Sequence, residues 1–141
     1  MLGFDRYCAN KIQRKNNLAM QFAESQAIYL QIAKIIEEKI LRKEWMEEER
    51  IPSVRDLAVA MEVNPNTVVR AYEILQQKEI IYNKRGIGYF VSEKACSTIK
   101  KEWKKNFKEQ DLPAFFKNIS LLDFPIDEIK NLYEQYKEKT S

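Results

Sequence analysis

The sequence has no histidine and only two cysteines, Cys8 and Cys96, among its 141 residues. Histidine is the commonest metal ligand and general base, and the cysteines lie too far apart for metal-ligand spacing. The three glycines form no phosphate-binding loop, and no nucleophile motif is present. These absences predict a protein that is not an enzyme and has neither a metal nor a cofactor.

Long hydrophobic runs are also missing. No stretch approaches the roughly 18 apolar residues of a membrane span, and the N-terminus lacks the apolar core of a signal peptide. Two unpaired cysteines fit a reducing compartment. With 45% hydrophobic residues, enough for a modest core, the sequence predicts a cytoplasmic globular protein without a membrane partner.

The sequence has no large excess of either charge, because 24 basic and 21 acidic residues leave a net charge of only +3. Residues 1–19 are basic, whereas residues 20–91 are slightly acidic, which argues against a purely electrostatic nucleic-acid binder. We expect residues 1–19 to be a flexible extension; an arm that contacts DNA phosphates is the open alternative.

Residues 51–75 predict two short helices separated by a tight turn. Ser53 can cap the first helix, and Asp56 completes a variant of the capping box. Apolar residues then follow at helical spacing on one face: Val54, Leu57, Ala58 and Met61.

The second helix is expected to start after Asn64, which can act as its N-cap, with Pro65 at the first helical position. Its buried stripe comprises Val68, Ala71, Tyr72 and Leu75. The opposite, outward face carries Asn66, Val69, Arg70 and Glu73. Two such helices with an exposed polar first turn are typical of a helix-turn-helix DNA reader.

Two β-rich runs, residues 80–82 and 89–91, flank a turn with two glycines. Lys84 and Arg85 make the turn basic. After a helix-turn-helix, such a hairpin can serve as a wing that contacts phosphate or a narrow minor groove. An ordinary hairpin with a solvated tip is the alternative, but its position favours the wing.

The flanking segments predict further helices. From Ala27 to near Lys43 isoleucines recur at helical spacing, and Ser25 is a candidate cap. Beyond Ser92, Pro113 separates two apolar faces, and Pro125 precedes a last helix. Two or three short helices cannot bury so many large side chains, so we expect a second subunit to cover the following residues: Ile99, Trp103, Phe107, Phe115, Phe116, Ile119, Leu132 and Tyr136. Packing back on the winged helix within one monomer is the alternative.

Four blocks of this sequence, Ala27–Ala33, Ile51–Ala58, Val63–Tyr72 and Arg85–Val91, closely resemble the winged-helix domain of GntR-family bacterial transcription regulators. The short helical tail is similar to that of the family's YtrA-type subgroup. The resemblance implies a mainly α-helical fold with a small β-hairpin: an extension (1–19), a winged helix-turn-helix (20–91) and a helical dimerisation tail (92–141). It also implies a homodimer that binds a pseudo-palindromic DNA operator and usually represses transcription.

The resemblance further implies which residues contact DNA. The family's DNA-contacting arginine at the start of the second winged-helix helix corresponds to Arg55, and the wing glycine to Gly86. The positions in the next helix correspond to Asn64, Pro65, Asn66, Thr67 and Arg70. Together with Lys84 and Arg85, these are the predicted DNA-binding residues.

The sequence departs from the family pattern at two places. Fatty-acid-responsive members have base-reading arginines where this chain has Pro65 and Val69, so their operator should not be assumed. Lys43 and Glu47–Glu48 stand where glycine and Pro-Gly are common, which leaves the geometry of this loop open. The tail also looks too short to enclose an effector pocket of about 300 Å³, so whether a small-molecule effector exists stays open.

We expect Arg70 and Asn66 to meet base edges, because guanidinium suits guanine and a side-chain amide suits adenine. Thr67 and Arg55 are expected to fix the backbone register. The alternative for the arginines is a solvated or ion-paired face, for example Arg70 with Glu73. The rival function is a dimeric winged-helix adaptor that binds protein without binding an operator.

Overall fold

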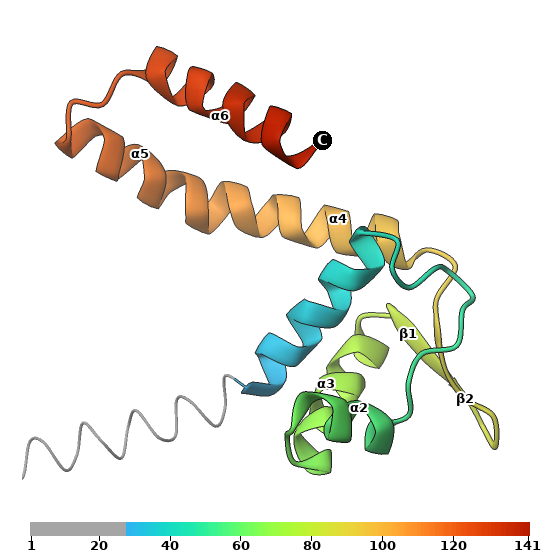
Figure 1. Cartoon of the computed structure of the whole chain (residues 1–141). Helices are drawn as coiled ribbons and strands as arrows, with labels where there is room; N and C mark the ends of the chain where they lie inside the picture. Colours follow the sequence, from blue (N-terminus) through green and yellow to red (C-terminus); the bar gives the residue numbers. More distant parts are fainter. Residues whose placement is uncertain (1–27) are drawn as a thin grey trace, which may run out of the picture. The chain divides into compact units, whose positions relative to one another are not determined.

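The computed structural model describes residues 28–141, and Figure 1 shows a mainly helical chain with one hairpin, as predicted. The chain is helical from residue 28 to residue 41. The later elements are α2 (Val54–Met61), α3 (Pro65–Gln77), β1 (Ile81–Lys84), β2 (Gly88–Val91), α4 (Ala95–Asn106), α5 (Leu112–Leu121) and α6 (Ile126–Thr140). The chain divides into two compact units, one ending at Ile99 and the other spanning Lys100–Ser141.

The first unit is built around the apolar faces of its helices. In the first helix Ile32, Ile36 and Ile40 are buried, whereas Ile28 and Ile35 each remain 40% exposed. The isoleucine pattern therefore predicts the helix correctly, but only part of the isoleucine-bearing face packs against the core. The expected cap Ser25 and the basic segment 1–19 lie outside the described residues.

Both predicted helix caps are confirmed. The Ser53 Oγ accepts a hydrogen bond from the Asp56 N–H at 3.1 Å and donates one to the Asp56 carboxylate at 2.7 Å. Before α3, the Asn64 side-chain oxygen accepts from the Asn66 N–H at 2.9 Å, and Pro65 opens the helix. Each cap satisfies a backbone N–H that has no partner inside its helix.

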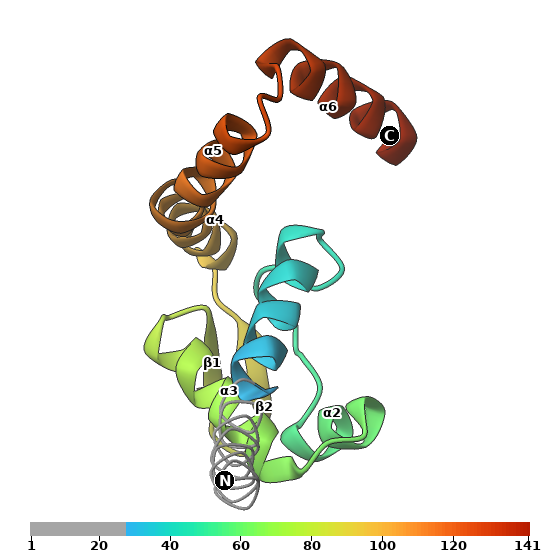
Figure 2. The ribbon, with the colours of Figure 1, turned by 90° about the vertical axis from the view of Figure 1, so that its left-hand side faces the viewer.

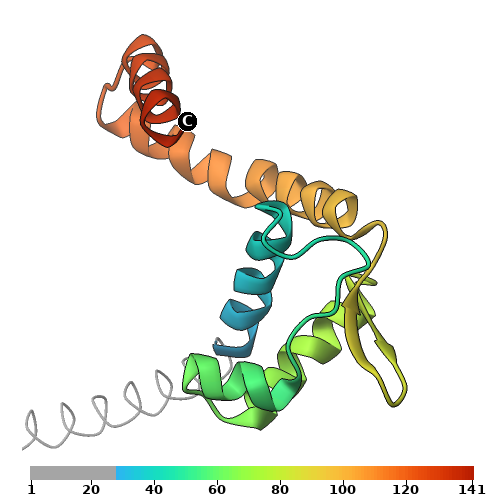
Figure 3. The same ribbon diagram turned by 45° about the vertical axis from the view of Figure 1, so that its right-hand side comes forward.

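The position of α3 in the first unit depends on a buried stripe and one buried tyrosine. The predicted stripe is confirmed, because Val68, Ala71, Tyr72 and Leu75 are all at most 1% exposed. The Tyr72 hydroxyl donates to the Pro52 carbonyl at 2.6 Å, which ties α3 to the chain just before α2. Figures 2 and 3 show α2 and α3 as adjacent short helices joined by a tight turn.

A partly buried ion pair connects the first helix with the end of α3. Glu37 is only 4% exposed, and Lys78, the C-terminal cap of α3, donates to its carboxylate at 3.2 Å. A buried carboxylate needs such a partner, because burial removes the water that would otherwise solvate the charge. Hydrophobic periodicity alone gave no sign of this pair.

The predicted hairpin is present, and a third segment widens it. β1 and β2 are antiparallel, with Tyr82 opposite Phe90 and Lys84 opposite Gly88. Residues 48–51, which include the end of the loop expected before Ile51, pair with β2: the Glu48 N–H and the Ile51 N–H donate to the Val91 and Tyr89 carbonyls, each at 2.9 Å. Figure 3 shows the hairpin extending from the unit with its turn at the free end.

The loop before Ile51 keeps the backbone geometry that glycine would favour, but without glycine. Lys43 and Glu48 have φ angles of 63° and 65°, in the left-handed region. These are two of the positions where the sequence departs from the family pattern. Both residues therefore carry the conformational strain that glycine would avoid.

A long helix with an irregular turn begins with α4 at Ala95, in the first unit, and continues into the second unit. Between α4 and α5, residues Phe107–Asp111 form a π-helical turn, and the helix continues through Pro113, the predicted boundary between two apolar faces. Proline has no N–H, and its ring collides with the carbonyl four residues earlier in a regular α-helix. A wider π turn directly before Pro113 accommodates the ring and lets the helix continue.

Neither α5 nor α6 contains a buried residue. Of the residues predicted to face a second subunit, Phe107, Phe115, Phe116, Leu132 and Tyr136 are exposed, and Trp103 and Ile119 are half-buried. The expectation for Ile99 is wrong: its side chain is 0% exposed, and Ile99 belongs to the first unit. Ile99 and Trp103 are spaced to lie on one helix face, but this spacing does not show that Ile99 is buried by its own chain whereas Trp103 is only half-buried.

Candidate nucleic-acid interface

The outward face of α3 carries the predicted base-reading side chains. Asn66, Val69, Arg70 and Glu73 are all exposed, while the opposite face of the helix is buried. The Asn64 cap uses its side-chain oxygen within the helix start, so that oxygen is engaged, whereas the Asn66 side chain is exposed. Asn66 and Arg70 lie one turn apart on one accessible face, the arrangement that major-groove readout requires.

Arg70 has an aromatic neighbour that the sequence did not predict. Its guanidinium carbon lies 5.9 Å from the ring centroid of Tyr29, on the first helix. The ion pairs formed among residues 28–141 include none between Arg70 and Glu73. The Arg70 guanidinium is therefore supported by a ring face, which leaves its N–H donors available.

Two further predicted residues lie elsewhere on the helix pair. Arg55 is exposed in the first turn of α2. Thr67 is half-buried, and its N–H donates to the Asn64 carbonyl at 2.9 Å. Arg55 thus belongs to α2 and Thr67 to α3.

The wing carries the second group of predicted residues. Arg85 and Gly86 lie in the exposed turn, where Gly86 has a φ of 78° that favours glycine. The Lys84 ammonium lies 4.6 Å from the Phe90 ring centroid and 5.8 Å from that of Tyr82. Lys84 is thus held against one face of the hairpin rather than extending freely from its tip.

Tyr82 joins the wing to the segment before Ile51. Its hydroxyl donates to the Glu48 carboxylate at 2.9 Å. This hydrogen bond, more than desolvation, raises the pKa of the Tyr82 phenol. Glu48, one of three consecutive exposed glutamates, is therefore engaged by the tyrosine.

Arg50 is a cation near the wing that sequence reasoning missed. It forms a β-bridge with Phe90, and a Cβ added to Gly88 would lie 3.0 Å from the Arg50 Nε. Gly88 also has a φ of 142°, which L side chains rarely adopt. Gly88 was the available sign in the sequence that another group lies close to the hairpin backbone. That this group is Arg50 depends on the pairing of residues 48–51 with β2.

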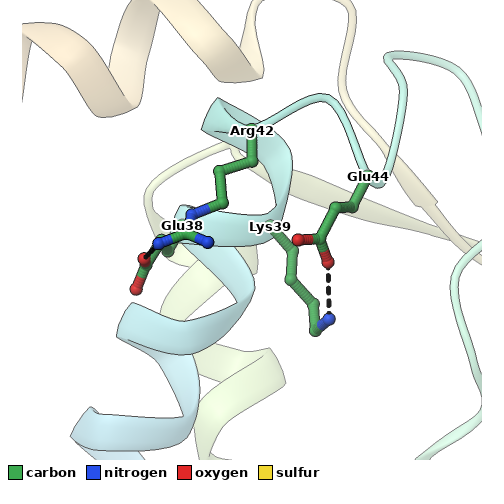
Figure 4. A network of polar contacts seen from close by, with 4 residues as sticks. All are labelled: Glu38, Lys39, Arg42 and Glu44. Atoms are coloured by element: carbon green, nitrogen blue, oxygen red, sulfur yellow. Dashed lines mark hydrogen bonds and ion pairs between the residues drawn. The ribbon is translucent and has the colours of Figure 1, made fainter. Parts of the chain in front are cut away.

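A separate cluster of charges closes the C-terminal end of the first helix, as Figure 4 shows. Arg42 donates to Glu38, and the Lys39 ammonium lies 2.7 Å from the Glu44 carboxylate, whose pKa it lowers by hydrogen bonding and charge. With Ile35, these four residues line a surface hollow of about 150 Å³. Each of the four charges has a partner, so the cluster shows no unsatisfied group for a ligand.

The described residues give no support for other kinds of site. Within residues 28–141 no group of three or more potential ligands could hold a metal, and Cys96 is free and buried. No described helix is long and apolar enough to cross a membrane. A hollow of about 330 Å³ on the second unit is lined by exposed charged side chains: Lys101, Lys104, Lys105, Lys108 and Glu109.

A capped helix pair that exposes Asn66 and Arg70, followed by a basic hairpin, defines a winged helix-turn-helix DNA-binding protein. The model for bacterial regulatory proteins of the gntR family matches residues 28–91. The HTH-type transcriptional regulator YhcF of Bacillus subtilis is 38% identical over 109 residues, which cover 77% of this chain and 88% of YhcF. The chain belongs to the GntR family of bacterial regulatory proteins.

Two further comparisons extend this result. The HTH-type transcriptional repressor YtrA of Bacillus subtilis is 38% identical over 86 residues, covering 61% of this chain and 66% of YtrA. A GntR-family transcriptional regulator from Bacteroides thetaiotaomicron superimposes with a TM-score of 0.64 at 44% identity, over 81% of this chain and 99% of that one. The predicted kinship with YtrA-type regulators is confirmed, and the protein is a DNA-binding transcriptional regulator rather than an enzyme.

Proposed function

We propose that this protein is a transcriptional repressor that binds a pseudo-palindromic operator as a homodimer. In this proposal the winged helix-turn-helix reads DNA and the helical tail joins the subunits. DNA is the partner, so the protein acts in the cytoplasm of a bacterium. The proposal names no effector.

The exposed face of α3 is the observation that carries the proposal. Asn66 and Arg70 are one turn apart, exposed, and fixed on a helix whose other face is buried. Arginine pairs with the O6 and N7 atoms of guanine, and an amide pairs with the N6 and N7 atoms of adenine. Each subunit therefore places these two side chains at base edges in one major groove.

The backbone contacts come from the flanking elements. Arg55 is exposed in the first turn of α2, the helix that precedes α3. Lys84, Arg85 and Gly86 provide a basic turn with a backbone that can approach closely. Such contacts fix orientation and register, and they make affinity fall steeply with salt.

The tail supports the homodimer. Phe116 is 51% exposed, and Leu121 and Leu122 are more than 70% exposed in the single chain. The tail thus leaves several large apolar side chains exposed, and an interface with a second subunit would bury them. A two-fold dimer buries the same surface on both subunits and places two copies of α3 on one side of DNA, about one helical turn or a multiple apart.

The repressor assignment is supported by the relative YtrA, whose name describes a transcriptional repressor. A dimer that covers its operator excludes other proteins from the same DNA. This is the simplest outcome for a chain whose described units are a DNA reader and a short helical tail.

Selection of bound sequences from a random duplex pool, with the purified full chain, tests the proposal. We expect an enriched inverted repeat whose affinity falls steeply between two salt concentrations. Transcription in vitro from a promoter that carries this repeat should fall when the protein is added. Folded, dimeric protein that enriches no sequence would contradict operator binding and favour a protein-binding role.

A further inference from the structure

We propose that Arg50 belongs to the DNA interface, where it and Lys84 form a phosphate-binding row on the outer face of the wing. The inference rests on the proposed operator binding, which it deepens by adding a residue outside both the helix pair and the hairpin. The row is defined as Arg50 and Lys84 together with Tyr82 and Phe90, whose rings lie beneath the Lys84 ammonium.

Strand pairing places these residues on one face. Side chains alternate between the two faces of a sheet, so residues that lie opposite each other share a face. Tyr82 is opposite Phe90, Lys84 is opposite Gly88, and Arg50 bridges to Phe90. The other face carries Ile81 and Val91, which are buried in the core, so the row faces outward.

Gly88 provides the space for the Arg50 side chain. A Cβ at Gly88 would lie 3.0 Å from the Arg50 Nε and 3.4 Å from its Nη2. The guanidinium therefore lies across the glycine backbone, one residue from the turn that spans residues 85–87. Strand pairing and this close contact hold the cation near the wing tip before any ligand arrives.

The Arg50 guanidinium has donors to offer. Within residues 28–141 no ion pair includes Arg50. The two carboxylates next to it in sequence are engaged elsewhere, because Glu48 accepts from Tyr82 and Glu49 accepts from the Met46 N–H at 2.8 Å. An exposed, unpaired guanidinium with planar donors suits a phosphate oxygen pair.

Lys84 completes the row from the adjacent strand. Its ammonium lies over the Phe90 ring at 4.6 Å, and Phe90 is the residue to which Arg50 bridges. Two cations on one face of the wing, Lys84 over the Phe90 ring and Arg50 beside Gly88, can follow a phosphate backbone by charge and leave base recognition to α3. The class of ligand is therefore the backbone of duplex DNA beside the site read by α3.

Titration of the full chain against the selected operator and an unrelated duplex, over a range of salt concentrations, tests the inference. Arg50→Gln should lower the slope of log affinity against log salt by about 0.9 for each subunit bound. At 0.1 M salt this corresponds to about an eightfold loss for each contact, on both duplexes. Arg50→Lys, which keeps the charge, should restore most of the slope.

Arg42→Gln is the matched control, because it removes one positive charge at the end of the first helix, where Figure 4 shows Arg42 paired with Glu38. It should leave the slope unchanged, and thermal unfolding should show that all variants are folded. An unchanged slope in Arg50→Gln would overturn the inference and leave operator binding intact. A loss confined to the operator and not restored by lysine would indicate base readout and overturn the phosphate assignment. Wild-type protein that binds neither duplex would refute the proposed function as well.

Discussion

At the scale of single residues, Arg70 is the side chain from which operator specificity is most directly predicted. Arg70→Ala should weaken binding to the operator by about 1–3 kcal/mol, because one bidentate base contact is lost. Binding to unrelated DNA should change much less, and unfolding should be nearly unchanged because Arg70 is exposed. Affinity titrations on both duplexes and a thermal melt measure the three quantities. A folded variant with full operator affinity would refute the assignment.

Tyr72 predicts a stability effect that depends on pH. Removing its hydroxyl in Tyr72→Phe should lower the free energy of unfolding by about 1 kcal/mol near neutral pH, because the bond to the Pro52 carbonyl is lost. Burial raises the pKa of the Tyr72 phenol well above its ordinary value of 10.0. The folded state therefore favours the neutral phenol, and this contribution is present below pH 10 and lost as pH rises above it.

Urea unfolding of wild type and Tyr72→Phe at pH 8 and at about pH 10.5 checks this prediction. The gap between the two proteins should narrow at the higher pH, because only wild type carries the Tyr72 phenol that ionises on unfolding. The other tyrosines are present in both proteins and cancel in the comparison. A gap that stays constant would mean that the hydroxyl contributes nothing to the pH dependence.

Some residue roles could be predicted from sequence and others could not, for a physical reason. Ser53 and Asn64 act within three residues of their own position, so local sequence was sufficient. The partners of Arg50 and Glu37 lie about forty residues away in the chain. Nothing in the local pattern marks such pairs, because they depend on how the elements fold together.

At the scale of elements, the loop between the first helix and α2 contains strain that a substitution can release. Lys43 has a φ of 63°, and its side chain is exposed. A left-handed conformation costs a residue other than glycine roughly 1–2 kcal/mol. Substitution by glycine removes this strain, but the greater entropy of glycine in the unfolded state offsets about 0.5–1 kcal/mol of the gain. Lys43→Gly should therefore raise the free energy of unfolding by about 0.5 kcal/mol.

Lys43→Val is the opposite test at the same position. A β-branched side chain fits the left-handed region poorly, so this variant should be less stable than wild type. Chemical denaturation of the three proteins gives the order glycine, lysine, valine. A glycine variant less stable than wild type would show that the Lys43 side chain contributes more than its backbone costs.

The elements themselves show where sequence patterns succeed. The two helices, their turn and the hairpin follow from caps, periodicity and turn residues, and all are present. The pairing of residues 48–51 with β2 was not predicted, because three of these four residues are charged and show no alternation of apolar and polar side chains typical of a strand. The π turn before Pro113 was missed because proline usually indicates a break.

At the scale of the whole molecule, apolar surface that a single chain leaves exposed predicts the oligomeric state. Neither α5 nor α6 buries a residue, and Phe116 is 51% exposed. Phe116→Glu should therefore give a monomer, because a desolvated carboxylate in an apolar interface is costly without a partner. Analytical ultracentrifugation at micromolar concentration measures the change.

Loss of the dimer should also weaken binding to the operator. A dimer binds two half-sites together, so a monomer should lose much more affinity for the full operator than for an isolated half-site. Asn118→Glu is the matched control, since it adds the same charge to an exposed polar position of α5 and should remain dimeric. If Phe116→Glu stays dimeric and keeps full operator affinity, subunits associate through another surface. If wild type itself is a monomer on and off DNA, the homodimer proposal is wrong, and the apolar tail must serve a different partner.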